Sequence, residues 1–221
     1  DHFFSLSKRE QADLVWQKVF IENSPVSEAA RGVLTTLGML GLDPGSRDLN
    51  AYRAYFAEKS AAQHIDDVFR VANLEAVVMT NDPFDNLERP IWEAEGARDP
   101  RFQAALRLDG LLMNWPTAME RLKGWGYEVK KSLDKKSVAE VNRFLKDWCE
   151  RMNPLYMAVS LSDDFNPQDN SECSKLLAKC VLPVCRELNL PMALMIGVRR
   201  QVNPALRLAG DAVAKGDINA I

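Results

Sequence analysis

Histidine is scarce in this sequence, with His2 and His64 as the two that occur among 221 residues. Imidazole is the commonest protein ligand for transition metals, so this scarcity excludes a histidine-rich metal centre built from the chain alone. His64 lies in the stretch AAQHIDDVF, where its place in the pattern favours a helix-surface role over metal ligation. We therefore predict no metal ligands within this chain.

The sequence also lacks the cysteine spacing of metal and redox motifs. Its four cysteines form no C-x-x-C pair, and Cys173, Cys180 and Cys185 all lie in one segment with helical spacing. A buried free cysteine behaves as a small apolar residue. We predict that all four, Cys149 included, are reduced core residues rather than parts of a disulfide framework.

Long apolar runs and an excess of basic charge are absent as well. No window approaches the roughly 20 apolar residues of a membrane span, and no charged segment followed by an apolar one opens the chain. The formal charge of −3 creates no field that would attract nucleic acid. These absences predict a cytoplasmic protein that binds neither a membrane nor nucleic acid.

Apolar residues make up 47% of the sequence, which is enough for a large core. Residues 5–72 show helical spacing almost throughout, and Ser7 followed three residues later by Glu10 is typical of a capping box at a helix start. We predict that residues 1–73 form a helical subdomain.

After residue 73, four short apolar runs alternate with longer amphipathic segments. The runs are LEAVVMT (74–80), FQAALRL (102–108), LYMAVSL (155–161) and PMALMIGV (191–198). They are typical of strands buried on both faces, and each intervening helix returns the chain to the same end of a parallel sheet. We predict an α/β fold of βα units over residues 74–221, with a last helix at 203–215.

Polar side chains follow every one of the four runs. They are Thr80, Asn81 and Asp82 after the first, Arg107 and Asp109 at the second, Ser162, Asp163 and Asp164 after the third, and Arg199 and Arg200 after the fourth. In barrels and open α/β sheets the ligand lies at the carboxyl ends of the strands, so we predict the site there. No glycine-rich motif follows the first run, which argues against a dinucleotide-binding fold.

The acidic residues at these ends have structural alternatives. Asp82 is either a site residue or the cap of a helix that Pro83 opens, with Asp85 in its first turn. Asp163 and Asp164 are suited to a hard divalent cation, but paired acids after a strand more often cap the entry of a helix. We predict the helix-entry role for that pair.

The arginines raise a similar choice. Arg107 lies in an apolar strand, where a guanidinium needs a partner. It is either the ion-pair partner of Asp82 or Asp109, or a bidentate clamp for the carboxylate of a ligand. Side chains alternate along a strand, so only one of Arg199 and Arg200 can face the site.

Several of these segments together resemble a known family. The segment LSKREQADLVWQKVFIENSPVSEAARGVLTTLGMLGL, the stretch VVMTNDPFDNLE, the R-x-D tip of Arg107 and Asp109, and LPMALMIGVRR occur in this order. They resemble the uronate isomerases (glucuronate isomerase family) of the amidohydrolase superfamily. The most specific piece is the family's T-[DN]-D-P-x-D-x-L, here residues 80–87. The family's H-I-G-x-x-R tip corresponds to residues 195–200, which selects Arg200 over Arg199.

The resemblance implies a partial (β/α)8 TIM-type barrel, in which the four strands are the second to fifth and the helical block is an insertion after the first. It implies an intramolecular oxidoreductase that interconverts aldose and ketose forms of a hexuronic acid, such as glucuronate or galacturonate, through an enediol. In this reading Asp82 is catalytic, and the substrate-binding residues are Thr80, Arg107, Asp109 and Arg200.

The implied partner is a small sugar acid, and a homo-oligomer is left open. The implied cofactor is a divalent metal such as zinc in the full-length protein, with its ligands outside this chain. Two positions depart from the family, because Met195 and Asp164 stand where the motifs H-I-G-x-x-R and S-D-H carry histidine. A divergent isomerase, a catalytically impaired sugar-acid-binding homologue and a metal-dependent hydrolase of the same superfamily are the alternatives.

Overall fold

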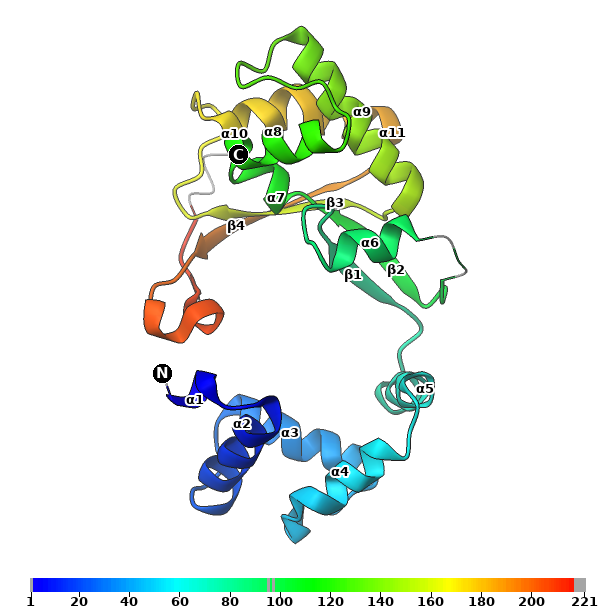
Figure 1. Cartoon of the computed structure of the whole chain (residues 1–221), viewed down its shortest axis with the longest axis vertical. Helices are drawn as coiled ribbons and strands as arrows, with labels where there is room; N and C mark the ends of the chain where they lie inside the picture. Colours follow the sequence, from blue (N-terminus) through cyan, green and yellow to red (C-terminus); the bar gives the residue numbers. More distant parts are fainter. Residues whose placement is uncertain (1, 95, 97, 217–221) are drawn as a thin grey trace. The chain divides into compact units, whose positions relative to one another are not determined.

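The computed structural model describes residues 2–94, 96 and 98–216. The chain divides into two compact units, Asp1–Glu75 and Ala76–Ile221 (Figure 1). Each unit has a hydrophobic core of its own.

The first unit is helical throughout. Its elements are α1 (His2–Ser5), α2 (Lys8–Val15), η1 (Trp16–Ile21), α3 (Glu28–Met39), η2 (Pro44–Ser46), α4 (Leu49–Ala57) and α5 (Ala61–Ala72). The capping box predicted at the start of α2 is present, with the Ser7 side chain accepting from the Glu10 amide and the Glu10 carboxylate accepting from the Ser7 amide. Trp16 stacks on Phe20 and meets Tyr52 edge to face, which joins η1 to α4.

The second unit consists of a sheet and the helices between its strands. Its elements are β1 (Val77–Asn81), α6 (Glu88–Glu93), β2 (Phe102–Arg107), α7 (Asp109–Leu112), α8 (Trp115–Gly124), α9 (Lys135–Met152), β3 (Met157–Ser162), α10 (Glu172–Leu176), η3 (Leu177–Val181), α11 (Leu182–Leu188), β4 (Met192–Arg199), η4 (Pro204–Gly210) and β5 (Ala212–Val213). The strands lie in the order β1-β2-β3-β4-β5; the first four are parallel, and β5 is antiparallel to β4. The prediction of a partial TIM-type barrel is confirmed.

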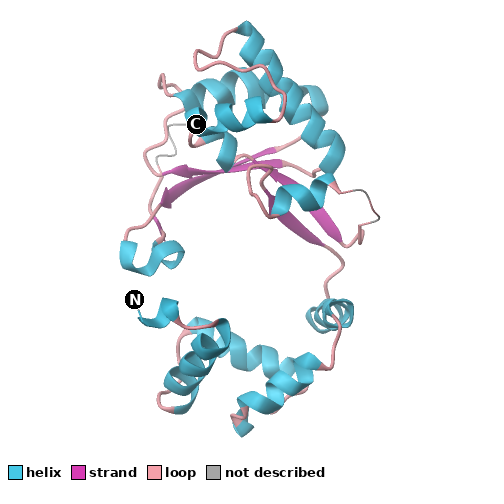
Figure 2. Cartoon of the chain, in the orientation of Figure 1, coloured by secondary structure: helices cyan, strands magenta, loops and turns pink. Residues whose placement is uncertain are grey.

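The helices α6 to α11 lie on one face of this sheet (Figure 2). The core between them and the sheet contains Leu106, Met157, Val159 and Leu161, which alternate along β2 and β3. Residues of the opposite parity point to the other face, called here the helix-free face because none of the helices α6 to α11 covers it. It carries Val78, Thr80, Gln103, Ala105, Arg107, Ala158, Ser160 and Met195.

The prediction that all four strands are buried on both faces is wrong for the outer two. β3 is buried almost along its whole length, whereas Val78 and Thr80 of β1 and Met195 of β4 are exposed. All three exposed residues belong to the helix-free face. An apolar run does not reveal whether both faces have a neighbour, because burial depends on what packs there.

The helix predicted at 203–215 is also wrong. A short 3-10 helix, η4, covers part of that range, and the chain then turns back and forms β5 beside β4. The Ala214 amide donates to the Gly197 carbonyl at 2.7 Å, so the segment is drawn into the sheet. Apolar spacing alone did not indicate this strand.

The four cysteines are free thiols in the helical layer of the second unit. Burial raises the pKa of Cys149 and of Cys180 to about 12 and that of Cys173 to about 11. Burial also raises the pKa of Cys185. These thiols are therefore protonated at neutral pH and pack as apolar groups.

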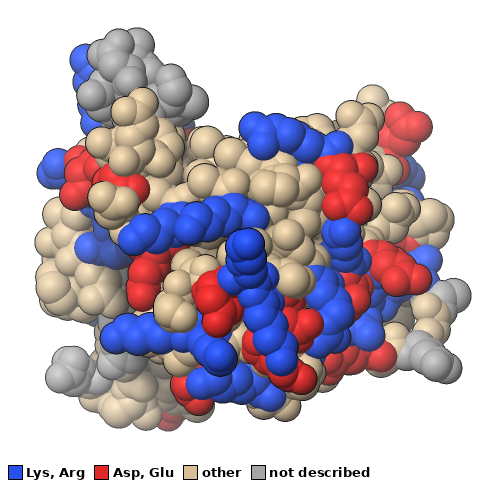
Figure 3. Space-filling model, turned by 90° about the horizontal axis from the view of Figure 1, so that it is seen from above, with Lys and Arg blue, Asp and Glu red and all other residues tan. Residues whose placement is uncertain are grey.

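Charges of both signs are interspersed on the surface seen in Figure 3. Oppositely charged residues of the second unit pair with each other, as in Lys136 with Glu128, Arg143 with Glu140, and Lys146 with Glu187. Exposed pairs of this kind contribute little to stability, because water screens the two charges. No helix among the described residues is long and apolar enough to cross a membrane.

Candidate functional site

A hollow of about 470 Å³ opens at the carboxyl ends of β1 and β2. It brings together residues from several of the strand ends singled out in the sequence, and its lining is Thr80, Asp82, Phe84, Asp85, Glu88, Arg107, Asp109, Gly110, Met113, Asn114, Thr117, Arg121 and Arg200. All five predicted site residues belong to this lining. This hollow is the candidate functional site.

Asp82 follows β1 and is held by backbone amides on both carboxylate oxygens. Its Oδ1 accepts from the Phe84 amide at 2.9 Å, and its Oδ2 accepts from the Gly110 amide at the start of α7 at 2.8 Å. Desolvation raises the pKa of Asp82 above its usual value, although the two amide bonds act in the opposite direction. The carboxylate is thus fixed in orientation and joins the ends of β1 and β2.

The segment after Asp82 is a turn, so the prediction that Pro83 opens a helix is wrong. The Asp85 amide donates to the Asp82 carbonyl, and α6 begins at Glu88. Asp85 accepts from the amides of Leu87 and Glu88, as a capping side chain does. Asp82 therefore closes the turn rather than capping a helix.

Arg107 and Asp109 form a bidentate ion pair at the end of β2. Arg107 Nε lies 2.9 Å from Asp109 Oδ2, and its Nη2 lies 3.0 Å from Oδ1. Asp109 Oδ2 also accepts from the Ser160 amide of β3. The pairing with Asp109, one of the predicted alternatives for Arg107, is thus present, and it raises the pKa of the guanidinium further.

Arg200 reaches the same carboxylate from the end of β4. Its Nη2 lies 3.3 Å from Asp109 Oδ1, and its Nη1 lies 2.9 Å from Asp211 Oδ2. Arg107 Nη1 and Arg200 Nε have no acceptor among the described residues, so each arginine keeps a donor for a ligand. Asp109 therefore holds two guanidinium groups beside the hollow.

Arg199 lies away from this cluster, because its side chain pairs with Asp163 at 2.6 Å. Asp164 accepts from the Ser162 hydroxyl. The predicted helix-entry role of Asp163 and Asp164 is wrong, since α10 begins eight residues later and Ser171 caps it. At this strand end Asp163 thus pairs with Arg199, and Asp164 accepts from the Ser162 hydroxyl.

Three residues that the sequence reasoning missed support the turn around Asp82. The Asp82 amide donates to the Glu88 carboxylate at 2.7 Å. Arg121 of α8 donates to the Phe84 carbonyl and to Asn86. Gly110 lies so close that a Cβ there would overlap Phe84. The sequence held a signal for Gly110 alone, a glycine directly after the R-x-D tip.

Comparison with known proteins finds a solved structure of similar geometry. No protein-family model matches the chain, and no curated protein matches it. The crystal structure of a uronate isomerase from Bacillus halodurans superposes with a TM-score of 0.95 and 51% identity, over 99% of this chain and 52% of that chain. The chain is a relative of the uronate isomerases. It spans about half the length of that protein.

A second structure, of a glucuronate isomerase from Caulobacter crescentus, has 15% identity over 70% of this chain and 38% of that chain, with a TM-score of 0.49. That likeness is too weak to support an argument. The resemblance to the uronate isomerases that the sequence motifs show is confirmed by the Bacillus halodurans structure.

Two residues of this chain stand where the motifs H-I-G-x-x-R and S-D-H carry histidine. Met195 lies on β4 with 42% of its surface exposed on the helix-free face, and Asp164 is exposed beside Ser162. The described residues contain no group of three or more His, Cys, Asp or Glu side chains arranged to hold a metal. These residues alone do not fit the implied metal, and we derive no step through it.

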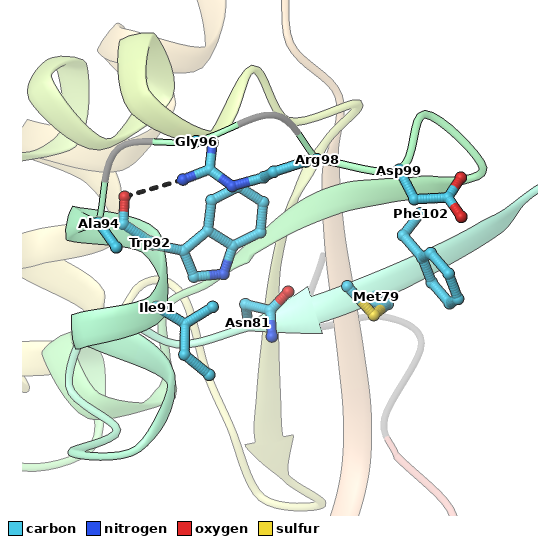
Figure 4. A pocket seen from close by; sticks show the side chains of 9 residues that line it. All are labelled: Met79, Asn81, Ile91, Trp92, Ala94, Gly96, Arg98, Asp99 and Phe102. Carbon is cyan, nitrogen blue, oxygen red and sulfur yellow. Dashed lines mark hydrogen bonds between the residues drawn. The ribbon is translucent and has the colours of Figure 1, made fainter. Parts of the chain in front are cut away.

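A second hollow of about 500 Å³ lies beside β1 (Figure 4). Met79 and Asn81 line it, and these belong to the opposite parity from Thr80. Trp92 of α6 also lines it, and Arg98 donates to the Trp92 carbonyl at 3.0 Å. Among the described residues its charged lining consists of Arg98 and Asp99, whereas several arginines and carboxylates converge on the first hollow, so we take the first as the candidate site.

Proposed function

We propose that the full-length protein interconverts the aldose and ketose forms of a hexuronic acid such as glucuronate or galacturonate. The observation that carries this proposal is the 51% identity to a uronate isomerase over nearly the whole chain. The cluster of Arg107, Asp109 and Arg200 at the strand ends supports it.

The side chains of the site suit a polyhydroxylated anion. A sugar acid presents a carboxylate, which accepts hydrogen bonds, and hydroxyl groups, which donate and accept them. The free donors of Arg107 and Arg200 suit the carboxylate, while Asp82 and the Thr80 hydroxyl suit the sugar hydroxyls. Because both arginines are already held by Asp109, little side-chain ordering accompanies binding.

The proposed reaction moves one proton between neighbouring carbons. A base removes the proton from C2 of the open-chain aldose, the C1 carbonyl oxygen gains a proton, and an enediol forms. Return of a proton to C1 and loss of the O2 proton give the ketose, so atoms and charges balance. Asp82 is proposed to orient a sugar hydroxyl and accept its proton, because its carboxylate is fixed by two amides.

A binding protein without catalysis is the second candidate. It is favoured by Met195 and Asp164, whose thioether and carboxylate cannot perform the chemistry of the histidines in the family motifs. Both candidates use the same arginines and the same class of ligand. They differ in whether a ketose is formed.

The test is to incubate the full-length protein with glucuronate or galacturonate in D2O, with and without added divalent metal. Nuclear magnetic resonance then follows the ketose and the deuterium that an enediol takes up from solvent, while calorimetry measures binding. We expect a deuterated ketose from the uronate and none from glucose, which lacks the carboxylate. Binding without a ketose would favour the second candidate, and no binding would overturn both.

A further inference from the structure

Strand β4 contains an irregularity directly before the two arginines. Leu161 of β3 pairs with Ile196, but the next residue, Ser162, pairs with Val198. Gly197 therefore has no partner on β3 and forms a β-bulge. The bulge lies two residues before Arg199, the last residue of β4, and Arg200 follows the strand.

The bulge changes which arginine faces the site. Met195 pairs with Ser160, so it lies on the helix-free face together with Arg107. In a regular strand the residues two and four further along share that face, which would place Arg199 there. The bulge instead places Val198 opposite Ser162, on the helix-free face. Arg200, two residues after Val198, then lies on that face as well.

The contacts agree with this shift. Arg200 reaches Asp109, the partner of Arg107, whereas Arg199 turns to Asp163. A single inserted residue thus exchanges the roles of two neighbouring arginines that are chemically identical.

Only glycine fits the bulge as the structure has it. Gly197 has a φ of +123°, a conformation that L side chains rarely adopt, and a Cβ there would lie 2.6 Å from the Ala214 carbonyl oxygen. The Ala214 amide in turn donates to the Gly197 carbonyl, so the chain just after β5 holds the bulge from the other side.

We propose that Gly197 is a positioning residue that selects Arg200, rather than Arg199, as the arginine of the site. It acts through the backbone and touches no ligand. The reading of Arg200 as a ligand-binding residue rests on the proposed function, but the placement of the two side chains does not.

The first test measures hexuronate binding and KM in the full-length protein. In the otherwise unchanged protein, Arg200→Ala is expected to raise KM on the order of tenfold, and Arg199→Ala to change it less than about twofold. In a Gly197→Ala background the strand is expected to become regular, so the larger effect passes to Arg199→Ala. An unchanged ranking of the two alanine variants in that background would overturn the proposal.

A second variant keeps the test decisive if Gly197→Ala fails to fold. Deletion of Gly197 leaves Ile196 next to Val198, which restores regular alternation with Arg200 still on the helix-free face. The proposal therefore expects the deletion to keep Arg200, not Arg199, as the sensitive arginine. Transfer of the sensitivity to Arg199 in the deletion variant would contradict it.

A third measurement separates this proposal from the proposed function. The coupling between Arg200→Ala and Asp211→Asn is measured by urea unfolding without ligand, as a double-mutant cycle. We expect a coupling in the protein with Gly197 that disappears after Gly197→Ala. If the coupling disappears after Gly197→Ala but the protein binds no hexuronate, the proposed function alone is overturned. If the coupling is undiminished after Gly197→Ala, the role of Gly197 is overturned.

Discussion

Asp109 is the residue on which the geometry of the site depends most. It binds Arg107 of its own strand end, the Ser160 amide of β3 and Arg200 after β4. Its side chain is only 14% exposed, so these bonds are partly shielded from water. One carboxylate therefore fixes two arginines that approach from different strands.

We expect Asp109→Asn to lower the free energy of unfolding by about 1–3 kcal/mol, because a charged acceptor of several hydrogen bonds is lost. The matched control is Asp163→Asn, which removes a carboxylate paired with the largely exposed Arg199 and should cost much less, because solvent screens an exposed ion pair. Urea unfolding of both variants measures the difference. Equal losses would mean that the cluster around Asp109 contributes no more than a surface pair.

The carboxyl group of Asp82 predicts a dependence on pH. Desolvation raises its pKa in the folded state, so the folded protein binds this proton more tightly than the unfolded chain. The contribution of this group to stability is fully present below the unfolded pKa and is lost as pH rises through the folded pKa. The same shift moves the acidic limb of kcat/KM to higher pH, since the proposed role needs the ionised form.

Asp82→Asn is the corresponding variant. We expect it to lower kcat by on the order of a hundredfold and to remove the acidic limb that belongs to Asp82. Profiles of kcat/KM against pH for the two proteins provide the measurement. An unchanged limb in the variant would assign it to another group.

At the scale of elements, the turn after β1 packs against the start of α7. Gly110→Ala is expected to destabilise the second unit by about 1–3 kcal/mol, because the added Cβ would overlap Phe84. Gly124→Ala is the control, since a Cβ at this position in α8 meets nothing within 4 Å. Thermal unfolding should show a lower midpoint for the first variant and no decrease for the second.

The elements also show what the sequence can and cannot predict. The four parallel strands were recognised because each is a short apolar run between amphipathic segments, and the strand-end residues of the site followed from them. Regular alternation counted from Met195 would place Arg199 on the face of the site. The bulge at Gly197 reverses this, and the sequence does not show the bulge because it exists only in the pairing with β3. Strand β5 was missed because it pairs antiparallel with β4 over two residues.

At the scale of the whole molecule, the edge of the sheet predicts association. Among the described residues β1 pairs with β2 alone, so its other edge has free backbone groups. Such edges pair with other chains. We expect the 221-residue chain, produced by itself, to self-associate as its concentration rises, which light scattering measures.

The matched variants for this prediction are Val78→Lys on the exposed side of β1 and Val33→Lys on the exposed side of α3. A lysine on the edge strand should weaken the association, whereas the lysine in the helical unit should leave it unchanged. A chain that stays monomeric at all concentrations would refute the role of the edge.

The cysteines of the helical layer allow local opening of that layer to be measured. An alkylating reagent reacts with the thiolate. In the folded protein Cys149, Cys180 and Cys185 are buried, Cys173 is partly buried, and the raised pKa values keep these thiols protonated. Iodoacetamide should therefore label each cysteine only as fast as its surroundings open. Partly exposed Cys173 should react first and fully buried Cys180 last. Mass spectrometry of the labelled peptides would then give the rate at which α9, η3 and the neighbouring helices open, without any introduced probe.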